Sequence, residues 1–524
     1  MRLGGADAKV FASPPEHPIA TSTQPPASRG LHSRARLPIL LSLLAAAMAL
    51  LGLGPPGDFV ALDSDGAIYL LMADHYSLSG HASALTDYVQ RVSQFPPLFP
   101  ILVALAGGGS GTIAIAHLVQ TVSLLVALAL VARLAWKLTG SLVIATALCL
   151  GVALLPSTLL LHTGLWSEFT YMVFAFGALA LAPERDAPLA RHWLGALLCA
   201  CAAATRNAGV VLSAAYALAL LLRAPRRAWP ALLLLPVPLV VQALLYSGGA
   251  SAYASLFSER TAGVAALWQH LLTNVVALWQ AWQLQFAVRP NPVVMLLAPA
   301  LLALVFVGAW QRLRLLAMDV IYAGGYMALL LIWPFPDVMP RLLFPLTPLL
   351  LLYAVLGAGA IARRWPAAPA PWPSLLPLLL VAVLALPASL GLLQRFAQAT
   401  PSFAPWRASR EWLQAPDLAT ARADVNFKRT LITLMRQSTA LVAPDQCIYT
   451  VQPGPAMFFT RRVSFPAPTG AARPAAPRCA YQLLLADSSL EAARRELWQP
   501  NELVLSVSDA GDPAGLLMRY PAIR

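Results

Sequence analysis

Long apolar segments separated by short polar connections constrain this chain of 524 residues more than any other feature. The hydrocarbon core of a bilayer is about 30 Å thick, so a helix needs about 20 apolar residues to cross it, with a range of about 17–25. Segments close to this length recur along the chain, although 193–205 and 208–222 are short. The full set is 37–54, 112–132, 141–160, 169–182, 193–205, 208–222, 229–246, 293–310, 315–333, 342–361 and 374–392.

The composition supports a mainly α-helical, polytopic membrane bundle. Hydrophobic residues make up 58% of the chain and charged residues 11%, whereas a soluble globular protein has about 25% charged residues. These proportions argue against a soluble enzyme, a disordered protein and a fibrous protein. The net charge of +13 predicts basic connections on the cytoplasmic side of a membrane rather than a nucleic-acid partner.

The basic residues also predict an orientation. If the N-terminal arginines lie in the cytoplasm, every later inside connection is basic, as the positive-inside rule requires. Those connections contain Arg133, Lys137, Arg185, Arg191, Arg223, Arg226, Arg227, Arg312, Arg314, Arg363 and Arg364. The pattern predicts eleven spans, with a cytoplasmic N-terminus and a C-terminus on the outer side. The polar residues 1–36 are expected to be a disordered cytoplasmic tail, and a cleavable signal peptide is the competing interpretation of 37–54.

The C-terminal part has scattered charges and a different periodicity. Alternating runs predict strands at 447–451, 481–485 and 503–507, and amphipathic patterns predict helices at 408–440 and 488–498.

We therefore expect three regions: the tail, a transmembrane module at 37–392 whose first outer loop is 55–96, and a small outer α/β domain at 393–524. Cys447 and Cys479 in the last region are the candidates for a disulfide, and the sequence leaves their pairing open.

Two acidic sites lie on the predicted outer face. Asp63 and Asp65 stand two residues apart just beyond the first span, and Glu168 stands at the outer start of a later span. Asp residues at this spacing can bind a divalent ion through oxygen, or one of them can act as a general base. Helix capping by the Asp residues, and a favourable helix dipole at Glu168, are the competing structural interpretations.

Two arginines on the same face are not explained by the positive-inside rule. Arg206 lies between two hydrophobic runs, where a charge costs about 2.5–3.5 kcal/mol on insertion scales and is rarely kept without a partner. Arg341 opens an inward-going helix, and a guanidinium at a helix N-terminus suits a phosphate. The pair indicates an anionic, phosphate-bearing ligand. A snorkelling Arg206 and an Asp337–Arg341 ion pair are the structural alternatives.

Five short fragments within 38–361 resemble motifs of the GT-C superfamily of membrane glycosyltransferases. More closely, they resemble the bacterial branch related to protein O-mannosyltransferases and lipid A aminoarabinose transferases. The fragments, in the family's order, are Asp65-Gly66-Ala67-Ile68-Tyr69, Phe95-Pro96-Pro97-Leu98-Phe99-Pro100, Leu165-Trp166-Ser167-Glu168, Thr205-Arg206-Asn207-Ala208-Gly209 and Arg341-Leu342-Leu343-Phe344-Pro345. The chain departs from the family at Leu342, at Asn207-Ala208 and at Gln94, where aminoarabinose transferases have a Lys.

The resemblance implies that a sugar moves from a polyprenyl-phosphate donor to a lipid, glycan or protein acceptor. This transfer would take place at the outer face of the bacterial inner membrane, among membrane lipids, with inversion of the anomeric carbon. Arg206 and Arg341 would bind the donor phosphate, where charge grows as the leaving group departs.

The other candidate residues would handle the acceptor. Asp65 is expected to be the general base, while Asp63 and Glu168 orient the acceptor or hold a divalent cation such as Mg²⁺ or Mn²⁺. The acceptor or donor pocket is expected to include Tyr69, His162 and Gln94.

Three alternatives stay open at this point. Enzymes of the O-antigen ligase or polymerase kind also have outer arginines, but their main functional loop comes late, whereas here the acidic loop follows the first span. A transporter of lipid-linked sugars binds near the bilayer midplane, often between inverted repeats, and the sequence shows no such repeats. The third alternative is an inactive relative that serves as a binding subunit.

Overall fold

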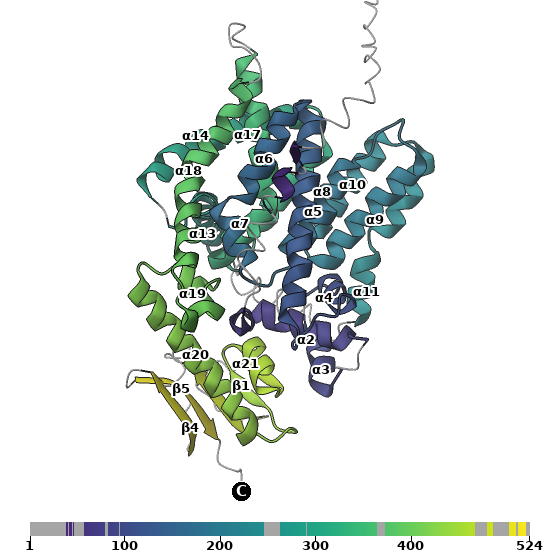
Figure 1. Ribbon diagram of the computed structural model, residues 1–524. Helices are drawn as coiled ribbons and strands as arrows, with labels where there is room; N and C mark the ends of the chain where they lie inside the picture. Colours follow the sequence, from purple (N-terminus) through teal and green to yellow (C-terminus); the bar gives the residue numbers. More distant parts are fainter. Residues whose placement is uncertain are drawn as a thin grey trace, which may run out of the picture.

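The computed structural model confirms a mainly α-helical fold with a small C-terminal sheet (Figure 1). The described residues are 38–39, 41–44, 46, 57–78, 82–93, 95–245, 263–289, 291–363, 372–466, 479–485, 502–509 and 512–519. The predicted tail, most of the first predicted span and the predicted helix at 488–498 lie outside them.

The helical bundle combines packing between consecutive helices with packing between helices further apart in the chain. Helix α5 packs on α6 and α8, α8 packs on α9, and α9 packs on α10, while α14 packs on α17 and α17 on α18. Their bounds are α5 Ile113–Thr139, α6 Leu142–Ala153, α7 Pro156–His162, α8 Glu168–Ala180, α9 Leu189–Thr205, α10 Gly209–Arg223, η2 Arg226–Leu234, α11 Val237–Leu245, α13 Val264–Gln283, α14 Pro292–Arg314, α15 Met318–Leu331, η3 Pro336–Val338, α16 Met339–Leu343, η4 Phe344–Leu346, α17 Thr347–Ala362 and α18 Trp372–Ala397.

Local sequence signals explain where several of these helices begin and end. Helix α5 ends at Gly140, whose φ of +66° is in the left-handed region that glycine adopts without strain. Ser141 then caps α6, and Asn291 caps α14 just before Pro292. Helices α6 and α7 meet at a bend of 54°, where Pro156 starts α7.

The number of membrane spans is only partly defined by helix length. By length and hydropathy, five helical stretches of the described chain can cross a membrane, or up to six if the bent pair α6–α7 is one span. The shorter apolar helices are α8, α9, α10 and α15, which coincide with four further predicted spans. The total of eleven therefore stays a prediction.

Large apolar side chains cover the outside of several helices, as expected of a protein surrounded by lipid. They include Val240 and Leu244 of α11, Leu296 and Phe306 of α14, and Leu379 and Val383 of α18. A soluble monomer rarely exposes apolar surface on this scale. The chain is therefore a membrane protein, in agreement with its composition.

Helix α13 was not predicted from the apolar segments of the sequence. Helix α13, Val264–Gln283, lies in a stretch predicted to be an outer loop, because polar residues such as His270 and Asn274 interrupt its apolar pattern. Both residues are buried. The Asn274 side-chain amide donates hydrogen bonds of 2.8 Å to the backbone oxygens of Leu331 and Trp333, so α13 holds the chain that follows α15.

The first outer loop forms short elements at the lower end of the bundle in Figure 1. They are η1 Asp58–Leu62, α2 Ser64–Tyr76 and α3 Ala84–Val92, and α4 Leu98–Leu105 follows directly after the loop. Helix α4 has eight residues, which are too few to cross a bilayer.

The C-terminal elements lie beyond this loop (Figure 1). They are η5 Pro401–Trp406, α19 Arg410–Leu413, α20 Leu418–Leu441, β1 Ile448–Thr450, α21 Pro453–Thr460, β2 Ser464–Pro466, β3 Tyr481–Leu485, β4 Glu502–Asp509 and β5 Asp512–Arg519. The strands form one mixed sheet in the order β2-β1-β3-β5-β4, with β1 parallel to β2 and β3 and with β5 antiparallel to β3 and β4.

Two further observations concern the C-terminal region. The predicted strands coincide with β1, β3 and β4, and Cys447 and Cys479 form a disulfide that joins the starts of β1 and β3. Helix α21 packs on α2, so the C-terminal region contacts the first outer loop directly. The predicted division at residues 392 and 393 stays a prediction; both residues lie in α18.

Candidate functional site

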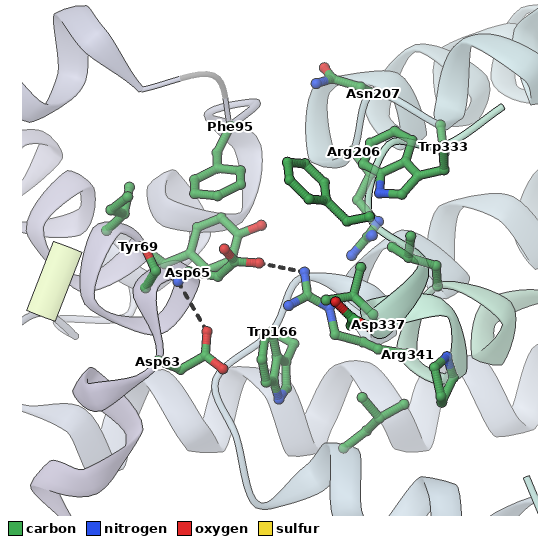
Figure 2. Close-up of a pocket in the computed structure, with 18 of the residues that line it drawn as sticks. Asp63, Asp65, Tyr69, Phe95, Trp166, Arg206, Asn207, Trp333, Asp337 and Arg341 are labelled. Atoms are coloured by element: carbon green, nitrogen blue, oxygen red, sulfur yellow. Dashed lines mark hydrogen bonds and ion pairs between the residues drawn. The ribbon is translucent and has the colours of Figure 1, made fainter. Parts of the chain in front are cut away.

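A large cavity lies where the first outer loop, the helical bundle and the C-terminal elements meet. Its volume is about 1110 Å³. The α2 side contributes Asp63, Asp65 and Tyr69, which face Arg206 and Arg341 across the cavity in Figure 2. The C-terminal elements contribute Arg410, Gln414, Val451, Pro453, Met457, Ser464 and Pro466.

Four charged side chains from distant parts of the chain form one connected cluster here. The Arg341 guanidinium donates to Asp65 Oδ2 through Nη2 and to Glu168 Oε1 through Nε, the latter at 2.5 Å. Arg206 Nη1 lies 2.5 Å from the same Glu168 oxygen. We call Asp65, Glu168, Arg206 and Arg341 the charge cluster. Sequence analysis predicted that all four share one face, and the structure brings them together.

Glu168 is the buried centre of the charge cluster. Its side chain is 1% exposed, and it occupies the first position of α8, where the helix dipole favours a negative charge. Burial of an unpaired carboxylate is costly, and two arginines on one oxygen offset that cost. Glu168 Oε2 has no hydrogen-bond partner among the described residues. The side chain lies behind the cavity wall, so it acts on the cavity through the two arginines.

Asp63 combines the capping and the site interpretations. Its Oδ1 accepts a hydrogen bond of 3.1 Å from the backbone N–H of Asp65 and so caps α2, while its side chain also lines the cavity. Burial, and then the charge of Asp65, raise the pKa of the Asp63 carboxyl to about 6, and Arg341 and Arg410 partly offset this shift. Asp63 therefore holds its proton to a higher pH than an exposed carboxyl does.

The start of α2 is fixed against the chain that precedes it. A Cβ on Gly66 would come well inside 3.0 Å of the Val60 backbone oxygen, so only glycine allows this approach. Tyr69, one turn further along α2, packs against Phe95 and Phe99 and shares a hydrogen bond of 2.9 Å with the Ser167 hydroxyl. Burial raises the pKa of Tyr69, so it stays neutral and available for hydrogen bonding.

The loop that carries Trp166 is held from behind by α5. Gln120 of α5 donates to the backbone oxygen of Gly164 at 2.9 Å and accepts from the backbone N–H of Trp166 at 2.7 Å. His162 does not line the cavity: it is buried against His117 and shares a hydrogen bond of 2.9 Å with Thr121. The structure thus places this predicted pocket residue in the support of the loop.

Two other predictions have different outcomes. Gln94, which was assigned to the pocket, lies outside the described residues. Asp337 lines the cavity, but Arg341 pairs with Asp65 and Glu168 instead of forming the alternative Asp337–Arg341 ion pair.

The predicted metal site does not fit the residues as they lie. Within the described parts of the chain, no group of three or more His, Cys, Asp and Glu side chains is arranged to hold a metal ion. Glu168 Oε1 is already bonded to two guanidiniums, whose positive charges oppose a cation at the same oxygen. Asp63 and Glu168 therefore do not form an Mg²⁺ or Mn²⁺ ligand set here.

Apolar residues form the wall beside the charge cluster. Leu284 and Val288 follow α13, and Leu329, Leu330 and Trp333 lie at the end of α15. A site with cations beside an apolar wall suits a ligand that joins an anionic head to a hydrocarbon chain. An anion that took the place of a carboxylate on Arg341 would also release Asp65 to accept a proton.

Two aromatic and basic residues of the site were not given a role by sequence reasoning. The Arg341 guanidinium lies over the ring of Trp166, 3.9 Å from the ring centroid, so Trp166 supports this arginine through a cation–π contact. Arg410 also contacts this ring, at 5.2 Å. Trp166 could have been recognised, since it belongs to the fragment Leu165-Trp166-Ser167-Glu168. Arg410 could not, because it is one of many charges in its segment.

Comparison with known proteins gives similarity to solved structures alone. No family model matches the chain, and no curated protein matches it in sequence. The chain is similar to the oligosaccharyltransferase AglB from Archaeoglobus fulgidus, solved with an inhibitory peptide and a dolichol-phosphate (TM-score 0.46, 11% identity, 85% of this chain and 69% of that one). It is also similar to ArnT from Cupriavidus metallidurans bound to undecaprenyl phosphate (TM-score 0.42, 12% identity, 94% of this chain and 98% of that one).

Proposed function

We propose that this protein is a glycosyltransferase that moves a hexosyl or pentosyl group from a polyprenyl-phosphate donor to an acceptor hydroxyl. The observation that carries the proposal is the charge cluster at the wall of an apolar cavity. Arg206 and Arg341 are the cations for the donor phosphate, and the apolar wall beside Trp333 receives the first isoprene units. The acceptor is a lipid, a glycan or a protein.

The positions of these groups support the following reaction. The donor phosphate takes over part of the bonding of Arg341, and this exchange releases the Asp65 carboxylate. Asp65 accepts the proton of the acceptor hydroxyl, whose oxygen forms a bond to the anomeric carbon. The bond from that carbon to the phosphate oxygen breaks, and the phosphate leaves with the electron pair, stabilised by the two guanidiniums. Attack opposite the leaving group inverts the anomeric centre.

The outer face of the bacterial inner membrane is the proposed site of transfer. The disulfide between Cys447 and Cys479 supports this, because disulfides form and persist in oxidising compartments such as the periplasm. The C-terminal elements that carry it also line the cavity, so both lie on the same side of the membrane. The basic connections of the sequence assign that side to the outside.

The test is transfer by membranes that contain the full chain. Polyprenyl-phosphate sugars with labelled sugar groups serve as donors, and the anomeric configuration of the product is determined by NMR. Asp65→Asn should lower the transfer rate about 10²- to 10⁴-fold while the protein still accumulates. Asp58→Asn is the matched control, since Asp58 lies in the same loop but pairs with Arg436 at the surface and does not line the cavity. Transfer by Asp65→Asn at the wild-type rate would remove Asp65 from its role.

A further inference from the structure

One arginine of the cavity wall has no salt bridge among the described residues. Arg206 and Arg341 are offset by Glu168 and Asp65 within the charge cluster. Arg410 also lines the cavity, and among the described residues it has no ion-pair partner. It is therefore the arginine of the described cavity wall whose positive charge no neighbouring carboxylate neutralises at contact distance.

Arg410 and Arg341 meet at the same aromatic side chain. The Arg410 guanidinium lies 5.2 Å from the centroid of the Trp166 ring, and the Arg341 guanidinium lies 3.9 Å from it. Arg341 uses Nε and Nη2 for its two carboxylates, which leaves Nη1 for a further acceptor. The two guanidiniums thus contact the same indole ring and line the same cavity.

The backbone that carries Arg410 is anchored firmly. Trp412, two residues on, is fully buried, and its indole N–H donates to the backbone oxygen of Arg395 at 2.9 Å. The backbone oxygen of Gln414 accepts a hydrogen bond of 2.8 Å from Arg289, which lies between α13 and α14. Helix α19 is therefore tied to the helical bundle, and Arg410 projects from a fixed position while its own side chain stays exposed.

We propose that Arg410, together with Arg341, binds the phosphate of the polyprenyl-linked donor. This inference rests on the proposed function and adds a specificity residue from outside the fragments that carry the family resemblance. A guanidinium suits the position, because its planar fork binds phosphate oxygens in pairs. It also supplies the charge that the neutralised charge cluster lacks. Discrimination between a phosphorylated lipid and its alcohol would then depend on the C-terminal region.

The experiment is calorimetric titration of the purified full chain in detergent with geranylgeranyl phosphate and with geranylgeraniol. Arg410→Ala should bind the phosphate about tenfold more weakly, which corresponds to about 1.4 kcal/mol, and should bind the alcohol as the wild type does. Arg410→Lys should keep part of the affinity. Arg407→Ala is the matched control, because Arg407 packs on Phe396 at 4.5 Å and does not line the cavity; it should bind both lipids normally.

The outcomes separate this inference from the proposed function. If Arg410→Ala binds geranylgeranyl phosphate as tightly as the wild type, the role of Arg410 is disproved and the proposed function stands. If the wild type binds the phosphate no better than the alcohol, both fail. Inorganic phosphate is titrated as well; binding as tight as that of the lipid phosphate would assign Arg410 to free phosphate and overturn the inference.

Discussion

Two buried carboxylates of the helical bundle are held by arginine in opposite ways. Asp319, in the first turn of α15, accepts hydrogen bonds from Arg312 on both oxygens, at 3.0 and 2.5 Å, and Tyr353 donates a third at 3.0 Å. Glu168 instead presents one oxygen to two arginines, and its other oxygen has no partner among the described residues.

The difference distinguishes a structural clamp from a site. Asp319 and Arg312 are saturated by each other and do not line the large cavity. They join the C-terminal end of α14 to the N-terminal end of α15, where the dipoles favour a cation and an anion respectively. The charge cluster faces a cavity through Asp65 and Arg341, so a ligand can exchange partners with it. Buried charge is present in both places. What distinguishes the charge cluster is that Asp65 and Arg341 are accessible from the cavity.

The largest expected effect breaks the comparison at Asp65. Asp65→Asn should lower the transfer rate about 10²- to 10⁴-fold, since a positioned base contributes a factor of that order. Its thermal unfolding midpoint should stay close to that of the wild type, because the amide can still accept a hydrogen bond from Arg341. The rate of sugar transfer and the unfolding curve are measured on the same preparation. A stable variant with full activity contradicts the assignment.

The opposite outcome is expected at the clamp. Asp319→Asn should lower the free energy of unfolding by about 3–5 kcal/mol, because it leaves the Arg312 charge buried without its partner. The transfer rate per folded molecule should not change. Thermal unfolding in detergent and activity normalised to folded protein provide the two readouts. Tyr353→Phe, which removes a single hydrogen bond to Asp319, is the graded control and should cost only about 1 kcal/mol. A loss of rate without a loss of stability would make Asp319 part of the site.

A third substitution separates binding from chemistry. Arg341→Ala should raise the apparent KM for the donor about 10- to 100-fold and lower kcat by a smaller factor, because hydrogen bonds to charged groups contribute about 1.5–3 kcal/mol each. Arg341→Lys keeps the positive charge but loses the planar guanidinium, so its KM for the donor should lie between those of the wild type and Arg341→Ala. Initial rates at varied donor concentration decide the matter; an unchanged KM in the alanine variant excludes Arg341 from phosphate binding.

The smallest effect concerns pH. The folded chain raises the pKa of Asp63 from 3.8 to about 6, so between these values the folded state binds more protons than the unfolded state. The contribution of Asp63 to stability therefore falls as pH rises from about 4 to about 6. The unfolding midpoint of Asp63→Asn minus that of the wild type should therefore increase by about 2 °C as the pH rises over this range. Parallel curves for the two proteins would refute the raised pKa.

Much of the helical bundle was predictable because apolar length is a local property. The predicted apolar segments 112–132, 208–222, 293–310 and 374–392 overlap α5, α10, α14 and α18 respectively. Helix α13 was missed, since its buried His270 and Asn274 interrupt the apolar pattern and are satisfied in part by backbone oxygens from a distant part of the chain.

The charge cluster was predictable for a related reason. A charge in an apolar setting stands out along the chain, and Arg206 and Glu168 were both recognised in this way. The sequence gives no comparable contrast for Arg410, and it cannot show that Trp166 supports two guanidiniums. Arg341 pairs with Asp65 and not with the nearby Asp337. Arg341 and Asp65 are 276 positions apart in the chain, so no local pattern encodes their contact.

Two glycines far from the cavity extend this dependence. Gly308 of α14 and Gly357 of α17 lie at a crossing so tight that a Cβ on either would come well inside 3.0 Å of the other helix backbone. Helix α17 continues the segment that carries Arg341. A bulkier residue at the crossing would push that segment outward and stretch the 2.5 Å bond between Arg341 and Glu168. The geometry of the charge cluster thus depends on two positions in the bundle where the side chain is a single hydrogen atom and carries no polar group.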